Sequence, residues 1–378
     1  MILPGSTLGI LGGGQLGRMT AMAARSLGYR VQVMDPDPSC PARFVVDACF
    51  VGTWNDARAA ADLARGSDVV TLEIEQISPA ALEAASRHAP LRPGADLLAM
   101  VQDRIRQKKW LTAHNFPVGP HRNIASPEDL AAALGDFGGE LFVKRACGGY
   151  DGRGQVRLSC GAGAAREPAA AAWLELGAAP CVAEQALDLE CEISVMAARS
   201  PSGELCSFPT ATNHHERQIL VWSVLPSSIP DWVERRAQEM ARDIASQLGL
   251  EGLLAVEMFL TRDGRLYVNE LAPRPHNSYH ASERGCVTSQ FEQAVRAVCD
   301  LPLGSVEIVR PAAIANLLGD LWLDGEPGFA RALRVPEVRL HLYEKHTPRR
   351  GRKMGHLSAT AKTPQDAVAR VLEAKSLL

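Results

Sequence analysis

The chain has 378 residues, enough for two or three domains of about 100–200 residues each. Its 40 lysines and arginines nearly balance its 43 aspartates and glutamates, which argues against a coat for nucleic-acid polymers and against a polybasic membrane anchor. Nine irregularly spaced cysteines without a C-x-x-C motif favour reduced thiols, and no apolar run approaches the ~18–20 residues of a membrane span, so we expect a cytoplasmic protein.

The first hundred residues alternate between strand and helix patterns. We expect strands at 8–11, 31–34 and 69–72, and helices at 15–27, 57–64 and 79–86. This alternation predicts a Rossmann-like parallel sheet that is covered by helices.

A glycine-rich turn follows the first expected strand. Residues 12–17 read Gly-Gly-Gly-Gln-Leu-Gly, a G-x-G-x-x-G pattern, and Asp35 ends the second strand. Glycines at such a turn admit a pyrophosphate at a helix N-terminus, and the acid would meet a ribose. The pattern is compatible with a nicotinamide cofactor and equally with a turn that lines another small-molecule phosphate site.

A second glycine-dense stretch, at 148–154, lies between expected strands at 141–144 and 155–158. A flexible loop of this kind can fold over a triphosphate while a lysine on the adjoining strand, here Lys144, neutralises the oxygens. The loop is not a Walker loop, because it lacks G-K-[ST] and no helix follows directly. An ordinary glycine-rich hairpin loop is the alternative.

Polar residues accompany the next expected strands, at 181–184 and 190–197. A strand that ends at Glu184 can hydrogen-bond an adenine edge through its backbone and a ribose through a carboxylate, and an edge strand with solvated acids is the alternative. His214 and His215 lack a third ligand at metal spacing, so a structural or substrate-adjacent role is favoured over a transition metal.

Two glutamates flank an Asp263-Gly264 turn. Two strands joined by a two-residue turn would place Glu257 directly opposite Glu270. Like charges in such a pair destabilise a sheet unless something lies between them, and Mg²⁺ takes carboxylate oxygens and shares them with phosphates. An exposed hairpin whose acids splay into water is the alternative.

Five cations lie within nine residues near the C-terminus: Lys345, Arg349, Arg350, Arg352 and Lys353. Arginines in such a cluster can hold a phosphate bidentately, and a solvated basic loop is the alternative. The flanking elements are expected as helices at 103–114, 231–248, 290–298 and 365–375 and strands at 339–343 and 357–359.

Together these parts resemble the ATP-grasp superfamily and, within it, the N5-carboxyaminoimidazole ribonucleotide synthases of purine biosynthesis. The resemblance covers essentially the whole chain, and its most specific motifs are G-G-Y-D-G-R-G at 148–154 and N-E-L-A-P-R at 269–274. It implies an α/β fold, α+β in the ATP-binding part. The implied parts are an N-terminal Rossmann-like domain at 1–103, a small lid subdomain at 104–187, a large subdomain with the metal site at 188–310, and a C-terminal subdomain at 311–378 packed on the large one.

The resemblance also implies the residues of the site. ATP would contact Arg104, Lys144, Gly149, Tyr150, Asp151, Gly152, Arg153, Gly154, Gln155, Glu184, Gln185, Ala186, Leu187, Glu192, His215, Asn269 and Glu270. Glu257 and Glu270 would hold Mg²⁺. The implied catalytic set is Lys144, Tyr150, Asp151, Arg274, Lys345 and Arg352, of which the last three suit the phosphate of the substrate.

The implied reaction is the carboxylation of 5-aminoimidazole ribonucleotide by bicarbonate and ATP through carboxyphosphate. A homodimer and hand-over of the product to a carboxyaminoimidazole ribonucleotide mutase are implied as well. The rivals are another ATP-grasp ligase, such as formate-dependent glycinamide ribonucleotide transformylase or a biotin carboxylase, and a nicotinamide-dependent oxidoreductase. Tyr279-His280-Ala281, Arg350 and the stretch 215–218 depart from the family's usual pattern at the edge of the substrate pocket.

Overall fold

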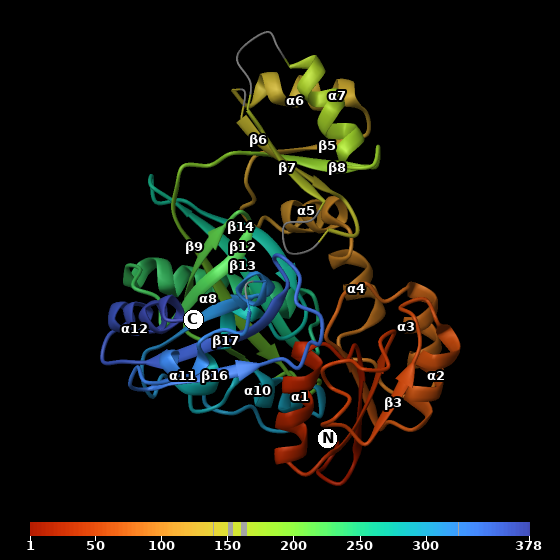
Figure 1. The fold of residues 1–378 in the computed structure, drawn as a ribbon. Coiled ribbons are helices and arrows are strands. Elements are labelled where there is room, and N and C mark those ends of the chain that lie inside the picture. Colours follow the sequence, from red (N-terminus) through yellow and green to blue (C-terminus); the bar gives the residue numbers. More distant parts are fainter. Residues whose placement is uncertain (139, 150–153, 160–164, 324) are drawn as a thin grey trace.

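The computed structural model of the chain describes residues 1–138, 140–149, 154–159, 165–323 and 325–378. Its strands form three sheets (Figure 1). The N-terminal sheet lies beside the large central sheet, and the small third sheet projects from the opposite end of the molecule.

The N-terminal sheet has four parallel strands in the order β3-β2-β1-β4, as the alternating pattern predicted. Strands β1 and β4 are almost entirely apolar and buried because helices cover both faces of the sheet. Strand β3 and helix α4 were not expected. The elements are β1 (Thr7–Leu11), α1 (Gln15–Ser26), β2 (Arg30–Asp35), β3 (Ala48–Val51), α2 (Ala57–Arg65), β4 (Val69–Leu72), α3 (Pro79–Ser86), α4 (Ala95–Val101) and α5 (Arg104–Ala113).

The small sheet is antiparallel, in the order β5-β8-β6-β7. Helices α6 and α7 lie together over one of its faces (Figure 1) and bury an apolar cluster that includes Leu130, Leu141 and Ala169. The elements are β5 (His121–Ile124), α6 (Pro127–Asp136), β6 (Glu140–Arg145), β7 (Gln155–Ser159), α7 (Arg166–Glu175) and β8 (Cys181–Gln185).

The central sheet has nine strands, in the order β14-β13-β9-β11-β12-β15-β17-β16 with β10 paired to β9. The three C-terminal strands continue the same sheet as the Glu257/Glu270 hairpin, so they share one hydrogen-bonded framework with it. The strands are β9 (Leu189–Arg199), β10 (Leu205–Ser207), β11 (Ala211–Glu216), β12 (Ile219–Leu225), β13 (Gly252–Thr261), β14 (Leu266–Ala272), β15 (Ala312–Leu318), β16 (Val338–Leu342) and β17 (Lys353–Thr360).

Helices pack on both faces of the central sheet. Helix α8 covers an apolar cluster with Val195 and Val256 on one face, and α10 lies between the sheet and α1 of the N-terminal domain. The helices are α8 (Asp231–Gln247), η1 (Asn277–Tyr279), α9 (Ser282–Gly285), α10 (Gln290–Val298), η2 (Gly319–Trp322), α11 (Phe329–Ala332) and α12 (Pro364–Ser376). Within the described ranges, none of the helices has the length and apolar character needed to cross a membrane.

Candidate active site

The hairpin of β13 and β14 brings Glu257 and Glu270 together as Cα partners, which confirms the predicted pairing. The predicted two-residue turn is wrong. The Thr261 N–H donates to the carbonyl oxygen of Arg265 at 2.9 Å, which leaves a three-residue loop between them. Gly264 closes this loop at φ +81°, a left-handed conformation that glycine adopts without steric cost.

A β-bulge in β14 restores the register that the longer loop would have shifted. Glu257 pairs with Glu270, whereas the next residue, Met258, pairs with Val268. Asn269 therefore has no partner on β13, and the strand is bent at this residue. The bulge leaves the backbone carbonyl and the side chain of Asn269 available to other elements.

Two lysines from different elements meet at Asn269. Lys108 Nζ of α5 donates to its backbone carbonyl oxygen at 3.1 Å, and Lys144 Nζ of β6 donates to its side-chain oxygen at 3.2 Å. Both lysines also pair with Glu184 of β8, at 2.8 and 2.5 Å. Burial alone would raise the pKa of Glu184, but the two lysines outweigh it and lower this pKa to about 2. Glu184 therefore stays ionised and holds both ammonium groups beside the hairpin.

Glu257 lies against histidines. His276 Nε2 is 3.0 Å from Glu257 Oε1, and the neighbouring His215 pairs with Glu192 at 2.9 Å. Burial alone would raise the pKa of Glu257, but the cationic groups around it, His276 first, lower this pKa to about 2. Burial alone would lower the pKa of His215, but Glu192 reverses the direction and raises it. The carboxylate of Glu257 is therefore ionised and available as a ligand.

Glu270 is the more exposed of the two glutamates, with 41% of its side chain accessible against 19% for Glu257. Its Oε1 accepts a hydrogen bond from Arg104 Nη2 at 3.1 Å. The same guanidinium donates to the carbonyl oxygens of Arg145 at 3.2 Å and Gly149 at 3.5 Å. Arg104 thus joins the glycine-rich loop of the small sheet to the hairpin of the central sheet. Two carboxylates beside two ammonium groups can together hold a divalent cation and a triphosphate.

The predicted phosphate-binding cations face the N-terminal domain. Arg274 Nε pairs with Glu75 at 2.8 Å. Lys345 Nζ donates to the side-chain oxygen of Gln15, the first residue of α1. Arg352 directly precedes β17. The structure therefore brings Arg274 and the basic C-terminal segment toward the same domain, although more than 70 residues of chain separate them.

The glycine-rich turn before α1 is closed by carboxylates of the chain itself. Glu73 accepts hydrogen bonds from the N–H groups of Gly14 at 2.5 Å and Gly17 at 2.7 Å, and Asp35 accepts from Gly13 at 2.8 Å. Burial raises the pKa of Glu73. Because these N–H groups are those that a dinucleotide pyrophosphate would use, the turn does not favour a nicotinamide cofactor.

Three family models match the chain in succession. The ribonucleotide synthetase preATP-grasp domain matches residues 5–102, the ATP-grasp domain 109–291, and the phosphoribosylaminoimidazole carboxylase C-terminal domain 312–370. The N5-carboxyaminoimidazole ribonucleotide synthase of Bacillus subtilis is 40% identical over 368 residues, which cover 97% of this chain and 94% of that protein. The chain belongs to the N5-carboxyaminoimidazole ribonucleotide synthases.

Solved structures agree with this assignment. An N5-carboxyaminoimidazole ribonucleotide synthetase in complex with ADP superposes with a TM-score of 0.93 at 39% identity, covering 99% of this chain and 97% of that one. The Aspergillus clavatus N5-carboxyaminoimidazole synthase, in complex with ADP and 5-aminoimidazole ribonucleotide, gives 0.89 at 31% identity, covering 98% of each chain. The predicted ATP-grasp fold is confirmed, and the synthase reading is supported over the transformylase, biotin carboxylase and oxidoreductase readings.

The remaining predicted nucleotide residues that the structure describes lie on neighbouring elements of the small sheet and on its connection to the central sheet. Gln155, in β7, pairs with Lys144 across the small sheet, and the segment 185–187 connects that sheet to β9. Strand β8, which carries Glu184, is interior to its sheet, so the alternative of a solvated edge strand is wrong. Tyr150, Asp151, Gly152 and Arg153 lie outside the described residues, and their roles stay predictions.

Sequence reasoning missed three residues that shape the site of the synthase: Lys108, His276 and Glu73. Lys108 lies one helical turn after Arg104, so the i, i+4 spacing could have indicated it. No local signal identifies Glu73, because its partners lie about 60 residues earlier in the chain.

Two departures from the family pattern have structural consequences in this synthase. Tyr279 is fully buried, and its hydroxyl contacts the carbonyl oxygens of Ser194 and Pro209, both at 2.8 Å. Arg217 and Gln218 form the turn between β11 and β12 with φ of +48° and +67°, a left-handed conformation that glycine would adopt at lower cost.

Proposed function

We propose that the chain carboxylates 5-aminoimidazole ribonucleotide on its exocyclic amine, consuming ATP and bicarbonate and releasing ADP and phosphate. The observation that carries this proposal is the opposition of Glu257 and Glu270 across the hairpin, with Lys108 and Lys144 fixed beside them by Glu184. This arrangement suits phosphoryl transfer, in which positioning and charge stabilisation supply most of the catalysis.

We assign Mg²⁺ to Glu257 and Glu270. Both are carboxylates of the kind that hard cations prefer, and they are Cα partners across the hairpin, so one ion can reach both. Bound there, Mg²⁺ would offset the charge of the ATP phosphates.

The first chemical step is attack of a bicarbonate oxygen on the γ-phosphorus of ATP, which forms carboxyphosphate and releases ADP. Lys144 offsets the charge on the transferring group from its fixed position on Asn269 and Glu184. The glycine-rich loop, joined to the hairpin through Arg104, closes over the phosphates and excludes water, since carboxyphosphate hydrolyses readily.

In the second step the amine of the ribonucleotide captures the carboxyl group, and phosphate leaves. Arg274, Lys345 and Arg352 hold the phosphate of the ribonucleotide, while Tyr150 and Asp151 face its base, and Asp151 or a neighbouring group takes the amine proton. Arg274 pairs with Glu75 and Lys345 donates to Gln15, and these contacts support a position of this substrate between the N-terminal domain and the central sheet. We also propose that the enzyme forms a homodimer, acts in the cytoplasm and passes its product to a carboxyaminoimidazole ribonucleotide mutase.

The test is ADP release measured with each substrate omitted in turn. The proposal expects full ADP formation only with ATP, Mg²⁺, bicarbonate and 5-aminoimidazole ribonucleotide together. ADP formation that requires formate and glycinamide ribonucleotide instead, or NADH-dependent absorbance changes without ADP, would contradict it.

A further inference from the structure

A second group of metal-ligating side chains lies apart from the nucleotide site, where α9 meets the last two strands of the central sheet. Glu283 comes from α9, His341 from β16 and His356 from β17. One ligand atom from each of the three lies within 4.8 Å of the others. None of these residues belongs to the ATP, magnesium or ribonucleotide sets described above.

The two histidines are held in position by the sheet. His341 and His356 are cross-strand partners, and their rings stack with centroids 5.1 Å apart and planes at 13°. The hydroxyl of Tyr343 lies 2.8 Å from Nδ1 of His356, which leaves Nε2 of that ring as its ligand atom. Such a hydrogen bond on the far nitrogen is the usual support of a metal-binding histidine.

Both histidines are neutral at pH 7, the form that binds metals. Burial lowers the pKa of His341 and lowers that of His356 to about 3. A third ring, His280, is fully buried with its centroid 4.9 Å from His356. Its Nε2 has no hydrogen-bond partner within the described part of the chain. A buried ring nitrogen beside the two histidines therefore lacks the hydrogen bond that buried polar atoms usually have.

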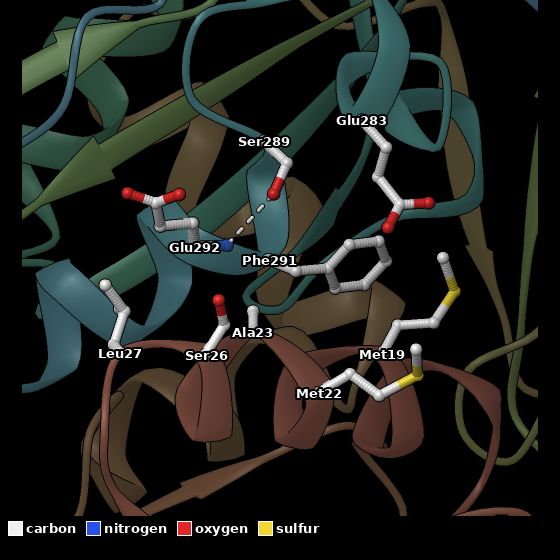
Figure 2. Close-up of a pocket in the computed structure, with 9 residues that line it drawn as sticks. All are labelled: Met19, Met22, Ala23, Ser26, Leu27, Glu283, Ser289, Phe291 and Glu292. Carbon is white, nitrogen blue, oxygen red and sulfur yellow. Dashed lines mark hydrogen bonds between the residues drawn. The ribbon is translucent and has the colours of Figure 1, made fainter.

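Glu283 supplies a carboxylate without a partner. Among the described residues, neither a hydrogen bond nor an ion pair reaches this carboxylate. Figure 2 shows it pointing into a pocket beside the ring of Phe291 and near Met19 of α1. Although the residue as a whole is exposed, the protein atoms around its carboxylate withhold water and raise its pKa to about 7. A bound cation would remove this desolvation cost by pairing with the ionised form.

We propose that Glu283, His341 and His356 form a binding site for a divalent first-row transition metal such as Zn²⁺, with a remaining coordination position open to the pocket. Two imidazoles and one carboxylate are a ligand set that Zn²⁺ takes at bond lengths of about 2.0–2.2 Å. Bonds of that length place ligand atoms roughly 3–3.5 Å apart. Because the two rings are nearly parallel, a shared ion requires rotation of the half-buried His341 ring as well as of the exposed Glu283 side chain. Arg18, whose charge acts on His341, is paired with Glu344 at 2.9 Å, so its charge is offset.

The metal would tie α9 to β16 and β17. Helix α9 follows closely after Arg274, which is assigned to the phosphate of the ribonucleotide, and after His276, which pairs with Glu257. This metal site is nevertheless separate from the proposed carboxylation, because Glu283, His341 and His356 are not among the residues assigned to ATP, Mg²⁺ or the ribonucleotide.

Binding of Co²⁺, followed by its visible absorption and by metal analysis after dialysis of the full chain, tests this site. We expect one bound Co²⁺ per chain with the intense visible bands of four- or five-coordination, and displacement by Zn²⁺. Glu283→Gln and His341→Gln should each weaken the affinity at least ~10-fold, and Tyr343→Phe by about 10–100-fold through the lost support of His356. Glu283 is exposed and His341 is half-buried, so we expect these variants to keep the fold.

Two controls separate this site from other carboxylates. Glu292 lines the same pocket but is paired with Arg296, so Glu292→Gln should bind Co²⁺ as the unaltered protein does. Glu270→Gln removes a ligand of the proposed Mg²⁺ site, yet it should keep the intense visible bands, because these come from the ion held by the two histidines. Absence of the intense Co²⁺ bands at micromolar concentration, or equal bands in Glu283→Gln, His341→Gln and the unaltered protein, would overturn the proposal. Loss of the intense bands in Glu270→Gln would reassign the absorbing ion to the hairpin.

Discussion

Glu257 and Glu270 face each other because two one-residue offsets in the hairpin cancel. The loop is one residue longer than a two-residue turn, and the bulge at Asn269 adds one residue to β14. With the longer loop but no bulge, Asn269 would face Glu257, and Glu270 would point to the other side of the sheet. The bulge therefore performs two tasks: it aligns the two carboxylates, and it exposes the polar groups of Asn269 to Lys108 and Lys144.

Replacing Glu270 should abolish the reaction while the protein stays folded. The side chain is 41% accessible, and its partner among the described residues, Arg104, keeps its hydrogen bonds to the carbonyl oxygens of Arg145 and Gly149. We expect Glu270→Ala to release no ADP above background when all substrates are present. Glu190→Ala, an exposed acid on the neighbouring β9, is the control and should retain activity. Turnover of Glu270→Ala near that of the unaltered enzyme would refute the metal assignment.

Replacing Glu184 should destabilise the fold more than replacing either lysine that it contacts. Glu184→Gln leaves two ammonium groups without their shared carboxylate in a buried setting, which typically costs about 3–5 kcal/mol. Lys108→Met removes only one of two partners, and Glu184 keeps Lys144. In urea unfolding, Glu184→Gln should have a lower midpoint than Lys108→Met. The reverse order would show that Glu184 does not hold Lys108 and Lys144 in place.

Stability should fall on acidification through the loss of two buried carboxylates. The pKa values of Glu184 and Glu257 are lowered from 4.5 to about 2 in the folded chain. A lowered folded pKa gives stability that is present above pH ~4.5 and is lost as the pH falls toward 2, by on the order of 3 kcal/mol per group. The free energy of unfolding measured from pH 6 to pH 2.5 checks this. In Glu184→Gln, the free energy of unfolding should decrease less steeply with falling pH than in the unaltered chain. An identical slope would contradict the lowered pKa of Glu184.

Lys345 should govern affinity for the ribonucleotide and not for ATP. Loss of a charged hydrogen-bond donor to a phosphate costs about 1.5–3 kcal/mol, roughly a 10–150-fold change. We expect Lys345→Met to raise KM for 5-aminoimidazole ribonucleotide by that factor, with KM for ATP within about twofold. Lys362→Ala, which removes an exposed cation just before α12, is the control and should leave both KM values unchanged. A selective increase in KM for ATP would place Lys345 in the other subsite.

Local patterns in the sequence predicted the N-terminal parallel sheet, the opposition of Glu257 and Glu270, and Lys144 beside a glycine-rich loop. These features depend on periodicity, turn residues and short spacings, which act over a few residues. The motifs at 148–154 and 269–274 carried the resemblance to the family, which the comparisons confirm.

Other features were decided only by the tertiary structure. The contacts of Lys108 and Lys144 with Asn269, the pairing of Lys108 with Glu184, and the capture of the glycine-rich turn by Glu73 each depend on segments far apart in the chain. The balance of burial and charge around Glu184 and Glu257 is also set by neighbours from several elements. A sequence states which ionisable groups are present, but their protonation and partners follow from the distances and the excluded water that packing creates.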